Sequence, residues 1–136
     1  MESYFKKEGL NYNPENEIMV TVGAMEGLYL TLLSIIDEGD EVIIPNPCYV
    51  SYEPCTILAG GVPVIIELKN ENEFRLTAEE LLNAITDKTK ILIMPFPNNP
   101  TGAIMEREDL EPIVDIVIKH DLFVLTDEIY SELNYN

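Results

Sequence analysis

The chain has 136 residues, which is enough for one domain with a hydrophobic core and too few for two domains of ordinary size. Hydrophobic residues make up 46% of the sequence, which excludes a disordered chain. The formal net charge of −17 argues against nucleic-acid binding, because a phosphate backbone requires clustered Lys and Arg. No apolar run reaches the length of a membrane span, and the first residues lack the apolar region of a signal peptide, so we expect a cytoplasmic protein without a membrane partner.

Predicted helices and strands alternate along the chain. In order they are a helix over 1–10 closed by Gly9, a strand over 18–22, a helix from Gly23 to Ile36, a strand over 41–44, a helix over 48–59, a strand over 62–68, a helix that begins at Thr77, a strand over 90–94, a helix over 107–119 and a strand over 122–125. Thr77 to Glu80 fits a capping box, and 107–119 has the apolar spacing of an amphipathic helix. Pro45 is expected to end the strand before it, since proline cannot continue a central ladder. The alternation predicts an α/β fold with a mostly parallel sheet, right-handed crossovers and helices on both faces.

Cysteine and histidine residues predict no metal site. Cys48 and Cys55 are too few for a disulfide framework and lack the spacing of metal ligands, so we expect small core or wall residues. His120, the only histidine, follows a helical pattern and is expected at a helix C-terminus or on the surface.

The segment from Leu122 to Tyr130 organises the candidate site. Leu122 to Leu125 have the composition of a strand buried on both faces of a parallel sheet, and Asp127 and Tyr130 follow directly. Ligands of open α/β sheets bind outside the carboxyl ends of the strands. A carboxylate there is costly unless a cation or a hydrogen-bond donor meets it, so we expect a partner for Asp127.

Two further segments are expected at the same edge of the sheet. The small residues Gly23 and Ala24 open a helix whose first amides, with that of Met25, could hold an anion, although such junctions are also common packing turns. Residues 97–102 form a loop that contains the amide side chain of Asn99. With a carboxylate and a phenol, these groups suit a flat, phosphorylated, nitrogen-containing ring. Turn formation by Asp127 and Asn99, and core packing of the tyrosines, are the structural alternatives.

Four sequence blocks resemble the class I/II aminotransferases, which are fold-type I pyridoxal-5′-phosphate enzymes. The blocks are Val22 to Glu26, Pro47 to Tyr52, Asn98 to Gly102 and Asp127 to Tyr130, and their order and spacing match across almost the whole chain. The resemblance implies that residues 1–136 are the central part of the large, cofactor-binding domain of such an enzyme, a three-layer αβα sandwich.

The resemblance also implies a role for each site residue. Asp127 would pair with the pyridinium nitrogen of pyridoxal 5′-phosphate and keep it protonated. Asn99 and Tyr130 would hydrogen-bond the 3-hydroxyl oxygen of the ring. Tyr49 would stack on the ring face, where many relatives carry tryptophan or phenylalanine.

At the other end of the ring, Gly23, Ala24 and Met25 would meet the phosphate through helix N-terminal amides. The family's Schiff-base lysine lies beyond the Asp-Xaa-Xaa-Tyr block, so we expect it beyond Asn136 and expect no catalytic residue in this chain. All six lysines of the chain precede that block. From the resemblance we also expect the family's N-terminal segment and small C-terminal domain to lie outside these 136 residues. We therefore expect a fragment that is inactive alone.

The parent enzyme is expected to move an amino group between an amino acid and a 2-oxo acid and, as in the family, to be a homodimer. Two alternatives remain open. The same blocks occur in carbon–sulfur β-lyases and decarboxylases of this fold, and a chain of this length could be a non-catalytic α/β binding module. The absence of a Gly-x-Gly-x-x-Gly motif and of a P-loop lysine argues against a nucleotide-binding domain.

Overall fold

The computed structural model describes residues 2–7 and 9–133 of the chain. Its elements in chain order are α1 (Glu2–Lys7), α2 (Ala24–Ile35), β1 (Glu41–Asn46), α3 (Tyr52–Leu58), β2 (Val62–Glu67), the short 3₁₀ helix Asn70–Asn72, α4 (Ala78–Ala84), β3 (Thr89–Met94), α5 (Arg107–Lys119) and β4 (Phe123–Thr126). None of the helices in this described part has the length and apolar character needed to cross a membrane.

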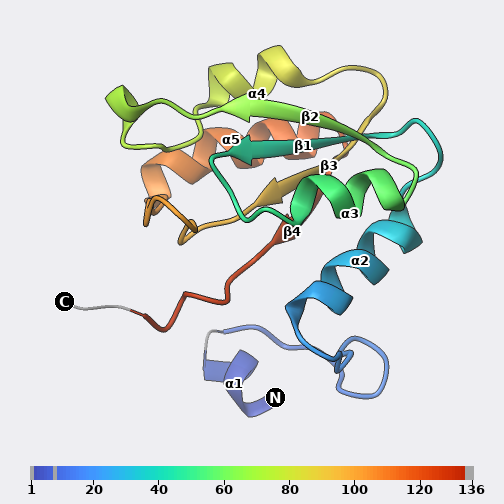
Figure 1. Cartoon of the computed structure of the whole chain (residues 1–136). Helices are drawn as coiled ribbons and strands as arrows, with labels where there is room; N and C mark the ends of the chain where they lie inside the picture. Colours follow the sequence, from blue (N-terminus) through green and yellow to red (C-terminus); the bar gives the residue numbers. More distant parts are fainter. Residues whose placement is uncertain (1, 8, 134–136) are drawn as a thin grey trace.

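The strands form one parallel sheet with the order β2-β1-β3-β4 (Figure 1). β1 pairs with β2 along its whole length, from Glu41 opposite Val62 to Asn46 opposite Glu67. Because all four strands run the same way, their carboxyl ends lie at one edge of the sheet, as the sequence predicts.

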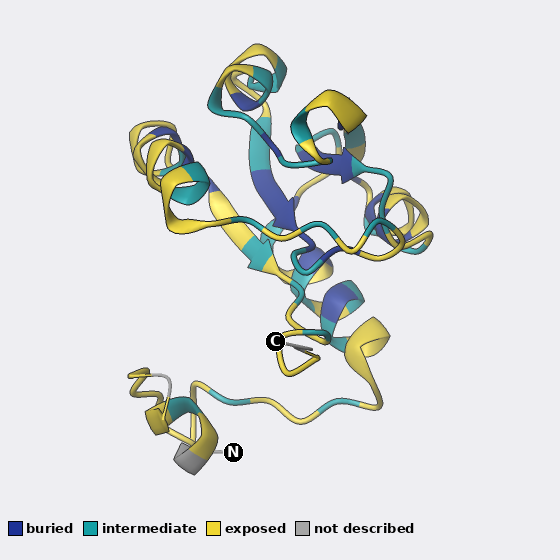
Figure 2. Ribbon diagram, turned by 90° about the vertical axis from the view of Figure 1, so that its left-hand side faces the viewer, coloured by how far each residue is buried: buried dark blue, intermediate teal, exposed yellow. Residues whose placement is uncertain are grey.

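Helices cover both faces of this sheet, which confirms the predicted three-layer αβα architecture. Val42 and Ile44 of β1 belong to a core cluster with side chains of α2 and α3, whereas Ile43 belongs to a second cluster with side chains of α4 and α5. The split follows from the strand period of two, which sends successive side chains to opposite faces. All three side chains are fully buried, and Figure 2 shows the buried segments at the centre of the molecule.

The predicted strand over 18–22 is wrong. This segment is an extended loop that precedes α2, and it pairs with no other strand in the described part of the chain. Met19, Val20 and Val22 are 63%, 76% and 88% exposed. Their apolar pattern is that of a strand, but a strand forms only where a neighbour satisfies its amides and carbonyls.

Two boundaries around the loop after β1 are also corrected. β1 continues through Pro45, which pairs with Ile66 of β2, while pairing with β3 has already ended at Ile43. The next helix begins at Tyr52 and not at Cys48. Pro54 then falls in the first turn of α3, where its missing N–H costs no helical hydrogen bond, whereas a helix from Cys48 would place it in the interior.

β4 differs from its predicted character. It was expected to be buried on both faces, but Phe123 and Val124 are 51% and 46% exposed. The reason is position: β4 pairs only with β3 in the described chain and is an edge strand. The inner strand β1, by contrast, is fully buried at Val42, Ile43 and Ile44.

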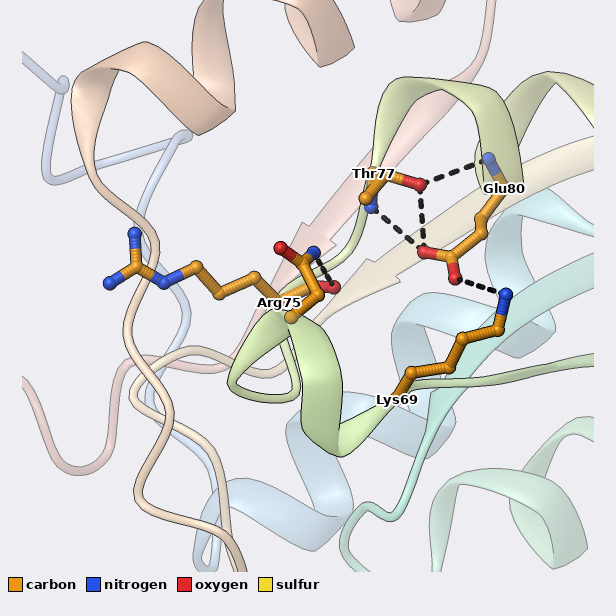
Figure 3. A network of polar contacts seen from close by, with 5 residues as sticks. Lys69, Arg75, Thr77 and Glu80 are labelled. Atoms are coloured by element: carbon orange, nitrogen blue, oxygen red, sulfur yellow. Dashed lines mark hydrogen bonds and ion pairs between the residues drawn. The ribbon is translucent and has the colours of Figure 1, made fainter.

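The remaining predicted helices are confirmed. α5 has the predicted bounds, and Thr77 caps α4 through a capping box with Glu80 (Figure 3). The predicted helix over 1–10 is observed for Glu2–Lys7, and Gly9 closes it at a φ of 76°, where the left-handed region favours glycine. Met1 and Glu8 of that prediction lie outside the described residues.

Candidate functional site

A pocket of about 360 Å³ lies at the carboxyl edge of the sheet, where the turn before α2 and the loops after β1, β3 and β4 meet. The pocket contains all seven residues that the sequence singled out for the cofactor. Its lining consists of Val22, Gly23, Ala24, Met25, Leu28, Tyr49, Tyr52, Pro95, Pro97, Asn99, Asp127, Ile129 and Tyr130. The fold thus brings together groups that are spread over most of the sequence.

Asp127 is held at the end of β4 by three hydrogen bonds. Its amide donates to the Met94 carbonyl of β3 at 3.1 Å. Its carboxylate accepts the Tyr52 hydroxyl at Oδ2 at 2.7 Å and the Ile129 amide at Oδ1 at 3.2 Å. No ion pair in the described part of the chain includes Asp127. The sequence predicts a cation or a hydrogen-bond donor as the partner of this carboxylate, and the structure supplies the Tyr52 phenol.

Tyr52 is the site residue that sequence reasoning missed. It is 3% exposed and begins α3, so its ring is part of the core while its hydroxyl reaches the pocket. Burial, followed by the hydrogen bond to Asp127 and the charge of that carboxylate, raises the pKa of the Tyr52 phenol. The hydroxyl therefore stays protonated and remains a donor at neutral pH. The only sequence signal was its place at the end of the Pro47 to Tyr52 block.

Asn99 and Tyr130 are neighbours in the lining of the pocket. The Asn99 side-chain amide donates to the Tyr130 hydroxyl at 3.3 Å. The neighbouring Asn98 has a different role: it is 4% exposed and its side chain donates to the Pro47 carbonyl at 3.0 Å. Asn98 therefore anchors the loop to the segment after β1, whereas Asn99 lines the pocket next to Tyr130.

The turn before α2 offers free amides. Gly23 has a φ of 82° and its own amide donates to the Thr21 carbonyl at 3.0 Å. The amides of Ala24 and Met25 in the first helical turn donate to no group within the described residues. Such amides at the positive end of a 12-residue helix favour an anion. The Glu26 carboxylate accepts a hydrogen bond from the Val22 amide at the same turn, and its negative charge disfavours an anion there.

Tyr49 lies in the pocket wall with 36% of its surface exposed. Its ring meets that of Tyr52 edge-on, with the centroids 5.7 Å apart and an interplanar angle of 77°. An edge-on contact of this kind uses the rim of one ring and not both of its faces. The two cysteines and the histidine lie where the sequence predicts them. Cys55 is buried, Cys48 is half-buried and His120 is the C-cap residue of α5.

The donor set can be tested against possible ligands. Within the described residues, no group of three His, Cys, Asp or Glu side chains could hold a metal ion. The set fits a ring that carries a protonated nitrogen, an oxygen substituent and an anionic arm, because a carboxylate, an amide–phenol pair and the residues of two free helix amides all line one pocket. The described pocket lining includes no cation for the anionic arm.

A parallel αβα sheet with such a pocket at its carboxyl edge defines an α/β protein whose candidate site fits a phosphorylated ring. Comparisons with known proteins make this class specific. The family model described as "Aminotransferase class I and II" matches residues 1–136. The chain belongs to the class I and II aminotransferase family, whose members depend on pyridoxal 5′-phosphate.

Similar proteins cover the whole chain but extend well beyond it. The chain is 44% identical over 135 residues to aromatic-amino-acid aminotransferase 2 of Thermococcus litoralis and 49% identical over 136 residues to an aspartate aminotransferase of Bacillus sp. strain YM-2. It covers 35% and 34% of those two proteins, and they cover 99% and 100% of it.

Solved structures of the same family have the same fold. The aromatic aminotransferase of Pyrococcus horikoshii superposes with a TM-score of 0.96 at 45% identity, over 99% of this chain and 36% of its own. The aspartate aminotransferase of Thermus thermophilus with maleate gives 0.93 at 41% identity, over 98% and 35%. The chain thus spans about a third of the length of its relatives.

Proposed function

We propose that this chain is the cofactor-binding part of a pyridoxal-5′-phosphate-dependent aminotransferase that transfers an amino group between an amino acid and a 2-oxo acid. One observation carries the proposal: the seven residues expected to contact the cofactor line a single pocket at the carboxyl edge of the sheet. The names of the relatives, which include aspartate and aromatic-amino-acid aminotransferases, support the same reaction class.

Each group of the pocket has a role in this proposal. When bound, the cofactor supplies an electron-withdrawing ring that stabilises negative charge at the substrate α-carbon. The Asp127 carboxylate accepts a hydrogen bond from the protonated ring nitrogen and keeps it protonated. Asn99 and Tyr130 hydrogen-bond the ring oxygen, while Tyr49 excludes water from one face.

The phosphate is assigned to the free amides of Ala24 and Met25. Gly23 supports this turn through its positive φ of 82°, which a side chain would strain.

The 136 residues are proposed to lack transamination activity on their own. None of the six lysines, at positions 6, 7, 69, 88, 90 and 119, is among the residues that line the pocket in the described part of the chain. A lysine that forms a Schiff base, the homodimeric state and the cytoplasmic location are proposed for the whole protein from its family.

The assignment of Asp127 can be tested with pyridoxamine 5′-phosphate, which needs no lysine for binding. We expect Asp127→Asn to weaken binding at least about tenfold, since a charge-assisted hydrogen bond contributes roughly 1.5–3 kcal/mol. Asp115→Asn, which makes the same charge change at an exposed position of α5, should bind as the unaltered chain does. Fluorescence titration measures the affinities, and equal affinity of the Asp127→Asn and Asp115→Asn variants would contradict the assignment.

A further inference from the structure

The Asp127 carboxylate reaches the pocket from a strand end that carries little support of its own. β4 is an edge strand with exposed side chains, and the turn after it is exposed at Glu128 and Ile129. Two of the three hydrogen bonds of Asp127 involve backbone amides near that strand end, its own and that of Ile129. The third, from the Tyr52 hydroxyl at 2.7 Å, is the shortest and comes from an element 75 residues earlier in the chain.

Tyr52 itself is held firmly. Its ring belongs to the core cluster formed by α2, α3, β1 and β3, and only 3% of the residue is exposed. Its carbonyl accepts the Thr56 hydroxyl at 2.9 Å in the buried face of α3. The Tyr49 ring also packs against it edge-on. A buried aromatic ring with neighbours on every side has one accessible rotamer, so the hydroxyl points to a fixed place.

We propose that Tyr52 is a positioning residue for the cofactor site: its hydroxyl holds the Asp127 carboxylate in one rotamer, so that the unused lone pairs face the ring nitrogen. A carboxylate has about four lone-pair sites, and Tyr52 and Ile129 use one each in this structure. Tyr52 acts through Asp127 and makes no contact with the reacting atoms. The inference rests on the proposed function, because it is the cofactor that makes the orientation of Asp127 matter.

The hydrogen bond from Tyr52 restricts the rotamers of Asp127 before the cofactor binds, so that binding has less side-chain entropy to remove. A half-buried aspartate with no side-chain partner can sample more than one χ1 rotamer, and each side chain that a ligand must immobilise costs roughly 0.5–1.5 kcal/mol. Residues that orient a metal-ligating side chain typically change affinity by about 10–100-fold when removed, and the same reasoning applies to a carboxylate that must meet a ring nitrogen. Because burial and the bond to Asp127 raise the pKa of the Tyr52 phenol, its hydroxyl remains a donor at neutral pH.

The test compares Tyr52→Phe with Tyr29→Phe in the 136-residue chain. Both changes delete one phenolic hydroxyl near α3: Tyr52 donates to Asp127 from the start of that helix, and Tyr29 donates to the Leu58 carbonyl at its end at 3.5 Å. The first readout needs no ligand: three-bond NMR couplings to the Asp127 carboxyl carbon report its χ1 rotamers. We expect one rotamer in the unaltered chain and in Tyr29→Phe, and averaged couplings in Tyr52→Phe. Averaging in the unaltered chain, or one rotamer in Tyr52→Phe, would overturn the proposal.

The second readout follows the ring nitrogen of ¹⁵N-labelled pyridoxamine 5′-phosphate on the protein as the pH is raised. We expect Tyr52→Phe to bind about tenfold more weakly and to lose the ring proton at a lower pH than Tyr29→Phe does. A ring nitrogen that titrates identically in both variants would overturn the proposal while leaving the cofactor site intact. If the unaltered chain bound no pyridoxamine 5′-phosphate, the proposed function would fail, and the couplings would still decide whether Tyr52 positions Asp127.

Discussion

Cys48 precedes the pocket residue Tyr49 in the sequence, and its thiol is expected to be unreactive at neutral pH. It lies in the loop between β1 and α3, next to Tyr49, and is half-buried. Burial, together with the nearby carboxylates of Glu53 and Glu67, raises the pKa of the Cys48 thiol to about 11. A thiolate is the nucleophilic form, so at neutral pH this thiol is almost entirely in its unreactive state.

We therefore expect Cys48 to react with a disulfide reagent at pH 8 at least about tenfold more slowly than free cysteine, whose pKa is about 8.5. Its rate should rise roughly tenfold for each pH unit up to pH 10, because the thiolate fraction does. The measurement uses a Cys55→Ala variant, so that the second, buried thiol cannot contribute. A rate at pH 8 equal to that of free cysteine would contradict the raised pKa.

At the scale of a single element, α4 shows how a short helix is started. The Thr77 hydroxyl accepts the Glu80 amide at 3.2 Å, and the Glu80 carboxylate accepts the Thr77 amide at 3.1 Å (Figure 3). Lys69 adds an ion pair to the same carboxylate at 3.5 Å, but its side chain is 67% exposed and contributes little. Burial alone raises the pKa of Glu80, yet the hydrogen bonds from Thr77 and the charge of Lys69 outweigh it and leave the pKa lowered.

Thr77→Ala should lower the free energy of unfolding by about 1–2 kcal/mol at pH 7, the usual cost of losing an N-cap. Because the folded pKa of Glu80 lies below its unfolded pKa, this stabilisation is present above the unfolded value and is lost as the pH falls through the folded one. The difference between the two proteins should therefore shrink in acid. Urea unfolding at several pH values measures it. Thr31→Ala in α2, where the hydroxyl only bonds the Gly27 carbonyl of its own helix, should cost less than about 0.5 kcal/mol.

At the scale of the whole molecule, the net charge and the exposed apolar surface have opposite effects on self-association. The net charge of −17 keeps molecules apart at low salt. The edge strand β4 exposes Phe123, and a cavity of about 480 Å³ between β4 and α5 is lined almost entirely by apolar side chains. An uncovered strand edge with apolar side chains is prone to pair with other chains.

Raising the ionic strength to about 0.5 M shortens the Debye length to roughly 4 Å and should increase self-association, as measured by sedimentation velocity. Phe123→Lys should suppress that association because it places a charge on the edge strand. Val50→Lys makes the same change in charge at an 81% exposed position outside the sheet and is the matched control. Equal suppression by both variants would assign the effect to net charge and not to the β4 edge.

The sequence by itself determined the fold class and the identity of the site blocks. Helix α5 and the capping box of α4 follow from local spacing, and a helix can be specified locally because its hydrogen bonds close within four residues. The alternation of elements was enough to predict parallel strands whose carboxyl ends meet at one edge. The resemblance of four blocks then named Asp127, Asn99 and their companions.

Only the tertiary structure decided what depends on a neighbour distant in sequence. The apolar segments 18–22 and 122–125 look alike in sequence, yet one is a loop and the other an edge strand, because a strand forms only where a neighbouring strand pairs with its backbone. Asn98 and Asn99 are adjacent and identical, yet one is buried against Pro47 and the other faces the pocket. The donor to Asp127 was not visible in the sequence either, since a hydrogen bond across 75 residues leaves no periodicity for local patterns to reveal.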